Sequence, residues 1–176
     1  PEFVQETLAA SEPLGTKDVL KFTIKAHGLA DSKILFDERP SATLKFEVVA
    51  SGGTDSNMTV SLYDVGTGEL LASGGAAACS SCQSSPLNGR SSVTFDDWEK
   101  DVEISGGSQK TFRVEVAFTN FLDKSDFFQL VLQDMDDGNT QLRYVDGAKT
   151  SEDNTVDGVA GTFRLLPMNG PIFVKQ

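Results

Sequence analysis

The chain has 176 residues but only one histidine, one tryptophan and two cysteines. Ser-His-Asp and Cys-His catalytic centres both need an imidazole, so a single histidine leaves few ways to build one. His27 stands beside Gly28 at the end of a predicted strand, and no Gly-x-Ser-x-Gly motif accompanies it. We therefore interpret His27 as a turn residue and expect that the protein is not an enzyme.

Long apolar runs and an excess of basic residues are also missing. No segment approaches the roughly 18 consecutive apolar residues of a membrane span, and no charged start followed by an apolar stretch indicates a signal peptide. The 15 Lys and Arg residues are outnumbered by 26 Asp and Glu residues, which gives a net charge of −11 at pH 7. Nucleic-acid binding depends on cationic side chains. We therefore expect no nucleic-acid partner and no membrane insertion.

Alternation of apolar and polar residues with a period of two is the dominant pattern that is present. It runs through VLKFTIKA (19–26), TLKFEVVA (43–50) and TFRVEVAF (111–118), as expected of strands with one face against a core. The segment FFQLVLQ (127–133) is apolar on both faces, which predicts a central strand that is covered on both sides. Further strands are predicted at 58–63, 92–95, 101–104, 141–145, 161–166 and 171–175.

Glycine, asparagine and aspartate cluster between these segments, for example at 51–55, 105–108 and 136–139, where turns are expected. About nine to ten short strands with almost no helix predict an all-β fold, an antiparallel β-sandwich that is immunoglobulin-like in the broad sense. A closed barrel is the alternative, and one short helix could form at 95–101. The core is expected to include Phe22, Phe46, Val114, Val116, Leu130 and Leu132.

The length of the chain fits a single domain, which we expect at residues 16–176. Residues 1–15 then form an N-terminal extension. The first three residues, Pro-Glu-Phe, resemble a sequence left by cloning, so we leave residues 1–3 out of the predicted fold.

Several segments together resemble a known class of domains. They are GTKDVLKFTIKA (15–26), ATLKFEVVASGG (42–53), VSLYDVGTGELLASG (60–74), VTFDDWEKDVEISGGSQKTFRVEV (93–116) and DGVAGTFRLLPMNGPIFV (157–174). In this combination the chain resembles the repeat-type β-sandwich domains in large secreted surface proteins of candidate-phyla-radiation bacteria. The resemblance implies an extracellular, cell-surface location and a structural or adhesion role. It also implies neighbouring domains or surface proteins as partners, and it supplies no catalytic residues.

The two cysteines, Cys79 and Cys82, lie in the small-residue run AAACSSCQSSP (76–86). A redox Cys-x-x-Cys pair sits at the N-terminus of a helix, which lowers the pKa of the thiol, whereas this chain is predicted to be all-β. A zinc site needs four ligands, and two cysteines with one histidine fall short. In a secreted protein we expect a disulfide between Cys79 and Cys82, which orders the loop and contributes on the order of 2 kcal/mol or less.

Two loops concentrate the oxygen-bearing side chains that calcium prefers as ligands. DMDDGN (134–139) follows the strand predicted at 127–133, and SEDNTVDG (151–158) lies further along the chain. Neither matches the EF-hand pattern, so a pair of solvated acidic loops is the alternative to a calcium site. The candidate metal ligands are Asp134, Asp136, Asp137, Asn139, Asp153 and Asp157.

Carbohydrate-binding domains commonly place sugar rings on exposed aromatic side chains, and the candidates here are Trp98, Tyr63 and Tyr144. Each of them could equally belong to the core or its rim. The alternative function is therefore a calcium-dependent module that binds glycans or a host surface. The leading prediction is a non-catalytic, extracellular β-sandwich module of a bacterial cell-surface protein.

Overall fold

In the computed structural model, the described residues are 2–28, 33–36, 43–51, 59–74, 89–95, 97–118, 123–133, 142–146, 155–157 and 165–176. Every regular element in these ranges is a β-strand. The helix considered for 95–101 does not form in its described part, where Trp98 instead makes an isolated antiparallel bridge with Ala72. No helix in the described ranges is long and apolar enough to cross a membrane.

One layer of the molecule is a five-stranded antiparallel sheet. It consists of β1 (Glu2–Gln5), β2 (Gly15–Lys25), β5 (Val60–Asp64), β6 (Leu70–Gly74) and β9 (Gln109–Phe118). The strand order is β1-β2-β9-β5-β6, so the two longest strands lie side by side and β1 forms one edge. Because successive side chains of a strand point to opposite faces, the period-two pattern gives this sheet one apolar and one polar face.

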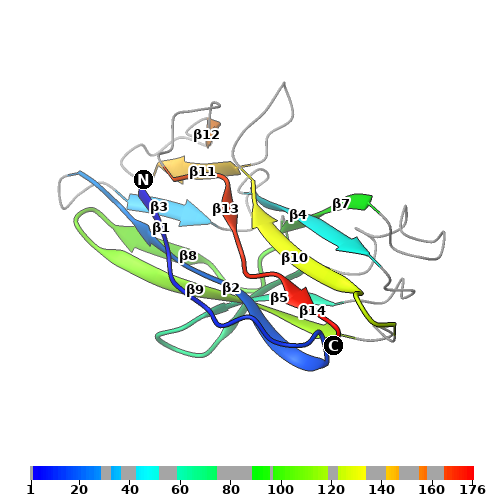
Figure 1. Ribbon diagram of the computed structural model, residues 1–176. Coiled ribbons are helices and arrows are strands. Elements are labelled where there is room, and N and C mark those ends of the chain that lie inside the picture. The colour runs from blue at the N-terminus through cyan, green and yellow to red at the C-terminus, as the bar shows by residue number, and fades with distance from the viewer. Residues whose placement is uncertain are drawn as a thin grey trace.

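The second layer is a larger antiparallel sheet (Figure 1). Its strands are β3 (Lys33–Phe36), β4 (Thr43–Ser51), β7 (Gly89–Phe95), β8 (Val102–Ser105), β10 (Phe127–Leu132), β11 (Leu142–Asp146), β12 (Thr155–Asp157), β13 (Met168–Asn169) and β14 (Phe173–Val174). The main path is β13-β10-β4-β11-β3-β8, while β7 pairs with β4, β12 with β11 and β14 with β10. The described strands form two separate, sandwich-like layers rather than one closed barrel.

The predicted all-β, antiparallel fold is confirmed. The described residues contain eleven strands of four or more residues and three shorter ones, more than the nine to ten expected. The strands predicted at 19–26, 43–50 and 111–118 correspond to β2, β4 and β9. Of the strand predicted at 161–166, residues 161–164 lie outside the described residues, and the two that follow are not in a strand.

The N-terminal residues take part in the fold, although the sequence led us to leave residues 1–3 out of it. β1 pairs with β2 through four residue pairs. Phe3 is 1% exposed and its ring stacks on that of Phe22, with the centroids 6.4 Å apart. The residues Glu2–Gln5 do not alternate between polar and apolar, so the sequence carries no strand signal there, and the edge of β2 supplies the partner that orders them.

Aromatic side chains from both sheets fill the space between the layers. The ring centroids of Phe22 in β2 and Phe46 in β4 are 6.3 Å apart, and those of Phe118 in β9 and Phe128 in β10 are 5.0 Å apart. Trp98 is 1% exposed and belongs to the same core. The six predicted core residues are all confirmed as buried: Phe22, Phe46, Val114, Val116, Leu130 and Leu132.

Residues 168–175, which we call the C-terminal strap, close one side of the sandwich-like fold. β13 and β14 pair with β10 of the larger sheet. Between them, Gly170 also approaches the carbonyl oxygen of Val19 in β2 of the five-stranded sheet. Gln5 of β1 donates a hydrogen bond from Nε2 to the backbone oxygen of Asn169. The strap is therefore tied to both layers.

Candidate functional site

The polar face of the five-stranded sheet carries the best-defined group of charged side chains in the described part of the chain. We call Asp18, Tyr63, Arg113 and Glu115 the arginine cluster. Strand pairing brings the four together, because Tyr63 lies opposite Arg113 and Asp18 lies opposite Glu115. Val114, between the two β9 members, points to the other face and is fully buried, which fixes the register of the strand that carries them.

Arg113 is the centre of the arginine cluster. Its Nη1 donates hydrogen bonds to Oδ1 of Asp18 at 2.7 Å and to Oε2 of Glu115 at 2.8 Å. Its guanidinium carbon lies 4.2 Å from the centroid of the Tyr63 ring, a cation–π arrangement. The hydrogen bond to Glu115 raises the pKa of Arg113, burial opposes that rise, and the bond to Asp18 adds to it. The guanidinium is thus a fixed cation that covers one face of the tyrosine.

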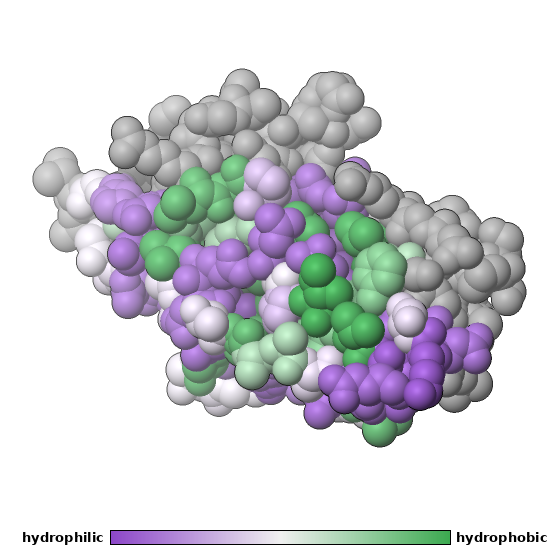
Figure 2. Space-filling view, viewed as in Figure 1, coloured by the Kyte–Doolittle hydropathy of each residue, from purple (hydrophilic) through white to green (hydrophobic). Residues whose placement is uncertain are grey.

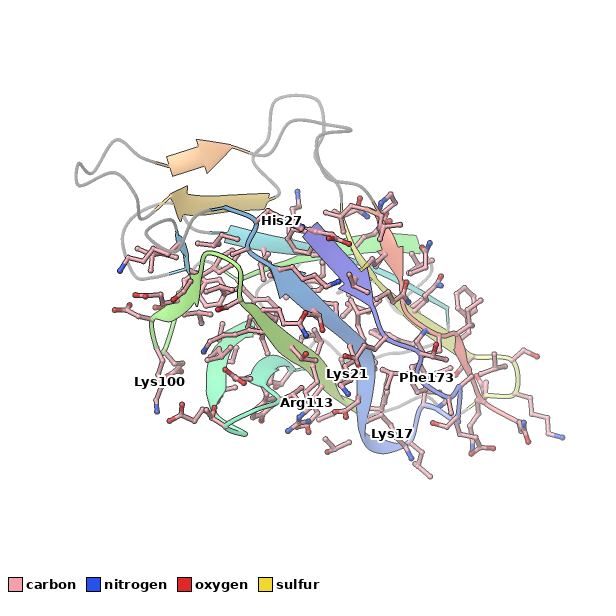
Figure 3. All side chains as sticks on the ribbon, turned by 90° about the vertical axis from the view of Figure 1, so that its left-hand side faces the viewer. Lys17, Lys21, His27, Lys100, Arg113 and Phe173 are labelled. Carbon is pink, nitrogen blue, oxygen red and sulfur yellow. The ribbon has the colours of Figure 1, made fainter. Side chains whose placement is uncertain are left out.

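Neighbouring polar groups on this face are paired in the same way. Nζ of Lys21 lies 2.8 Å from Oε2 of Glu6, and the hydroxyl oxygens of Thr23 and Thr111 are 2.8 Å apart. Figure 3 labels Lys21 and Arg113 on this sheet. Ion pairs of this partly exposed kind each contribute about 0 to 1 kcal/mol. The ion pairs named here therefore neutralise one another on a partly exposed surface.

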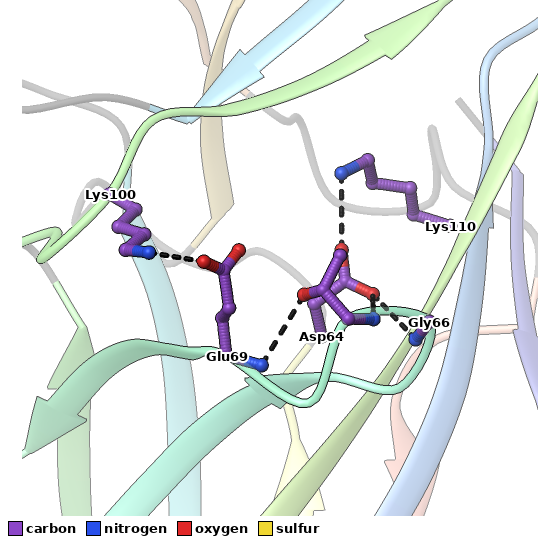
Figure 4. Close-up of polar contacts among 6 residues, drawn as sticks. Asp64, Gly66, Glu69, Lys100 and Lys110 are labelled. Carbon is purple, nitrogen blue, oxygen red and sulfur yellow. Dashed lines mark hydrogen bonds and ion pairs between the residues drawn. The ribbon is translucent and has the colours of Figure 1, made fainter.

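The turn between β5 and β6 is organised by the buried carboxylate of Asp64 (Figure 4). This side chain is 8% exposed, and its Oδ2 accepts a hydrogen bond from Nζ of Lys110 at 3.1 Å. Its Oδ1 accepts the backbone N–H of Gly66 at 2.7 Å and that of Thr67 at 3.3 Å. Both carboxylate oxygens are therefore satisfied, and the aspartate closes the turn.

The pKa of Asp64 lies below the ordinary value of an aspartate. Burial by itself raises this pKa, but the hydrogen bonds from Lys110 and Gly66 and the charge of Lys110 together outweigh burial. A carboxylate with a lowered pKa in the folded state stabilises the fold above its unfolded pKa. That stabilisation is lost as the pH falls through the folded value. Asp64 is thus one source of acid sensitivity.

Asp64→Asn is expected to lower the free energy of unfolding at pH 7 by about 1–3 kcal/mol, because Lys110 loses its anionic partner. The difference from the wild type should shrink as the pH falls below about 4, where the wild-type carboxylate also becomes protonated. Urea titrations at several pH values measure both effects.

Glu69→Gln is the matched control for this prediction. Glu69 forms an exposed ion pair with Lys100 on the neighbouring segment, so its neutralisation should leave the stability nearly unchanged. A difference between wild type and Asp64→Asn that does not vary between pH 7 and acid would contradict the assigned role of the carboxylate.

The aromatic residues suggested as a platform for glycans are placed differently from one another. Trp98 packs in the core with its ring centroid 5.1 Å from that of Phe36, so it offers no exposed face. Tyr63 is half-buried, and the guanidinium of Arg113 lies over its ring. Tyr144 is in β11, of which the backbone alone is described. The predicted platform therefore lacks Trp98.

His27 is exposed just after β2, and its Nε2 lies 2.8 Å from Oε2 of Glu2. Cys79 and Cys82 lie outside the described residues, so their disulfide stays a prediction. Asp157 is in β12, of which the backbone alone is described. The other candidate metal ligands also lie outside the described residues: Asp134, Asp136, Asp137, Asn139 and Asp153. Among the side chains that are described, no group of three or more His, Cys, Asp or Glu residues could hold a metal ion.

The calcium site at 134–139 and 151–158 stays a prediction with a direct test. Millimolar calcium should raise the melting temperature relative to a chelator, because a divalent ion removes the repulsion among neighbouring carboxylates. Extracellular modules bind calcium at about 10⁻⁴ to 10⁻³ M, so the gain is set by mass action in this range. Thermal melts with calcium, with magnesium and with chelator measure it. Identical melting temperatures with calcium and with chelator would leave these acids as solvated loop residues.

The sequence predicts that 127–133 is covered on both faces, and the structure agrees only in part. Val131 is 5% exposed, whereas Phe127 is half-buried. On the strap that pairs with β10, Ile172 is 50% exposed and Val174, directly opposite Phe127, is 42% exposed. Figure 2 shows hydrophobic side chains gathered around β14. These residues make a small apolar patch.

Sequence reasoning missed the roles of Asp64 and Arg113. Asp64 has a local signal, because an aspartate two residues before a glycine is typical of a turn that the carboxylate closes. The arginine cluster has no such signal, since its members come from three strands that are distant in the chain and meet only through strand register.

Comparisons with protein-family models, curated proteins and solved structures found no match for this chain. The functional argument therefore depends on the fold, on the residues described above and on the sequence resemblance.

Proposed function

We propose that the chain is a non-catalytic, immunoglobulin-like β-sandwich module of a bacterial cell-surface protein, with a structural or adhesion role. Two antiparallel sheets that enclose an aromatic core support the immunoglobulin-like architecture. The observation that carries the proposal is the position of the chain ends, which lie at opposite ends of the molecule (Figure 1).

Strand pairing agrees with this placement of the ends. Glu2 lies opposite Lys25, at the end of β2 that pairs with Gln109. At the other end of β9, the ring of Phe118 packs against that of Phe173, close to where the chain leaves the fold. Domains with their chain ends far apart can be joined end to end, so that each one extends the protein and contacts its neighbours at its two ends. This geometry suits neighbouring domains or other surface proteins as partners.

Other properties support a non-catalytic role outside the cell. The one imidazole, His27, is exposed and paired with Glu2. The net charge of −11 and the paired charges of the polar face favour a soluble, well-hydrated surface. The resemblance to bacterial surface-protein domains implies the same location, and an oxidising exterior would allow the predicted disulfide.

Antibodies raised against the folded domain test this proposal. They should label intact, non-permeabilised cells of the bacterium that carries the gene, and brief treatment of those cells with a protease should remove the signal. A cytoplasmic protein in the same cells is the control, because its antibody should bind only after permeabilisation. If the domain too is labelled only after permeabilisation, the proposal is overturned.

A further inference from the structure

β1 begins at one end of the five-stranded sheet and runs along β2 toward the middle of the sheet. It pairs with β2 over four residue pairs, starting at Lys25. A pull on the N-terminal end is therefore directed along the strand. Two anchors resist that pull: the buried ring of Phe3, which stacks on Phe22, and the carboxylate of Glu2, which lies 2.8 Å from His27.

The C-terminal strap runs along β10 toward the opposite end of the molecule, as β1 runs along β2. It pairs with β10 through both β13 and β14. The pairing continues at Lys175, whose N–H donates to the carbonyl of Asp126 at 2.8 Å and whose carbonyl accepts from Ser125 at 3.0 Å. The ring of Phe173 is 1% exposed and lies 5.7 Å from that of Phe118. A pull on the C-terminal end is thus directed along the strap.

The two terminal segments are also joined to each other. Gln5 at the end of β1 donates a hydrogen bond to the backbone oxygen of Asn169 in the strap. Nζ of Lys175 lies 2.9 Å from Oε2 of Glu12, in the segment that connects β1 to β2. These two contacts add to the pairing of each terminal segment with its own sheet.

We propose that this domain bears a pulling force applied at its two ends, a role that rests on its proposed place in a surface protein. The hydrogen bonds between antiparallel strands are perpendicular to the strands. A force along the strands loads all pairs of a terminal strand at once, whereas a force across them breaks one pair after another. Resistance to forced unfolding is set by the unfolding barrier, which is higher when several pairs and a buried phenylalanine must give way together.

Single-molecule force spectroscopy tests this with three pairs of attachment points in one protein. Cys79→Ser and Cys82→Ser remove the native thiols from all three versions. The first version is pulled between its two chain ends. The second is pulled between the N-terminal end and His27→Cys, an exposed site from which β1 peels away from β2. The third is pulled between the C-terminal end and Lys124→Cys, an exposed site from which the strap peels away from β10.

We expect the first unfolding force in the end-to-end geometry to exceed both peeling forces several-fold. The second version breaks the pairs between β1 and β2 and the third breaks those between the strap and β10, and the end-to-end pull loads both sets. Repeating the end-to-end pull with His27→Cys or Lys124→Cys present and its thiol blocked leaves the direction of the pull as the only difference. An end-to-end force equal to or below either peeling force would overturn the proposal that the domain bears a pulling force. Antibody labelling of intact cells does not depend on this measurement, so the surface location stands or fails separately.

Discussion

Replacing Phe22 with alanine is expected to lower the free energy of unfolding by about 3–5 kcal/mol, the usual cost of removing a buried phenylalanine. The side chain is 0% exposed. Its ring centroid lies 6.4 Å from that of Phe3, 6.3 Å from that of Phe46 and 5.5 Å from that of Phe112. These rings come from three other strands and from both sheets. The resulting cavity would thus face both layers.

Lys21→Ala is the matched control, because Lys21 is adjacent in the chain but points to the polar face and pairs with Glu6. Its removal should change the stability by less than about 1 kcal/mol. Urea unfolding followed by the fluorescence of the buried Trp98 measures both variants. A loss below about 1 kcal/mol for Phe22→Ala would contradict its central place in the core.

Much of the fold could be predicted because the controlling signal is local. Every second residue is apolar over seven positions in β4, in β9 and from Leu20 in β2 to Ala26 just beyond it, and this alternation identifies the strand and its buried face together. The six core residues predicted from these and from β10 are all buried. A strand of that length needs no knowledge of its partners to be recognised.

Some of the short strands could not be predicted, because they form only against their partners. β14 lies within the strand predicted at 171–175, whereas β1 and β3, of four residues each, and β13, of two, have no counterpart among the predicted strands. These segments show no regular alternation of polar and apolar residues. Phe3 is buried because the edge of β2 is available to it, and Phe173 is buried because β10 pairs with the strap. The burial of both side chains thus depends on tertiary contacts, which a local sequence pattern does not reveal.

The functional groups divide in the same way. The spacing of Asp64 and Gly66 is a local turn signal. The bond between Asp18 and Arg113 depends on the register of β2 against β9, which a bulge between Asp18 and Leu20 shifts. A local pattern cannot specify where such a bulge falls, so the arginine cluster emerges only from the folded chain.

Replacing Gly170 with alanine is expected to cost at least about 2 kcal/mol of stability, because two backbone segments occupy the space that a methyl group needs. A Cβ on Gly170 would lie 2.9 Å from the carbonyl oxygen of Leu130 in β10, and closer still to that of Val19 in β2. Neither oxygen can rotate away as a side chain would. The strap would have to shift, and the bond from the N–H of Gly170 to the Leu130 carbonyl, 2.8 Å long, would be lost.

Asn169→Ala is the matched control for this variant, because Asn169 is the exposed neighbour in the same strap. Its hydrogen bond from Gln5 uses the backbone oxygen, which alanine retains, so the stability should change by less than about 0.5 kcal/mol. A shifted strap should also speed hydrogen exchange at the amide of Lys175, which donates to Asp126, while the amides shared by β2 and β9 stay protected. Wild-type stability and exchange in Gly170→Ala would contradict the close approach of the strap to both sheets.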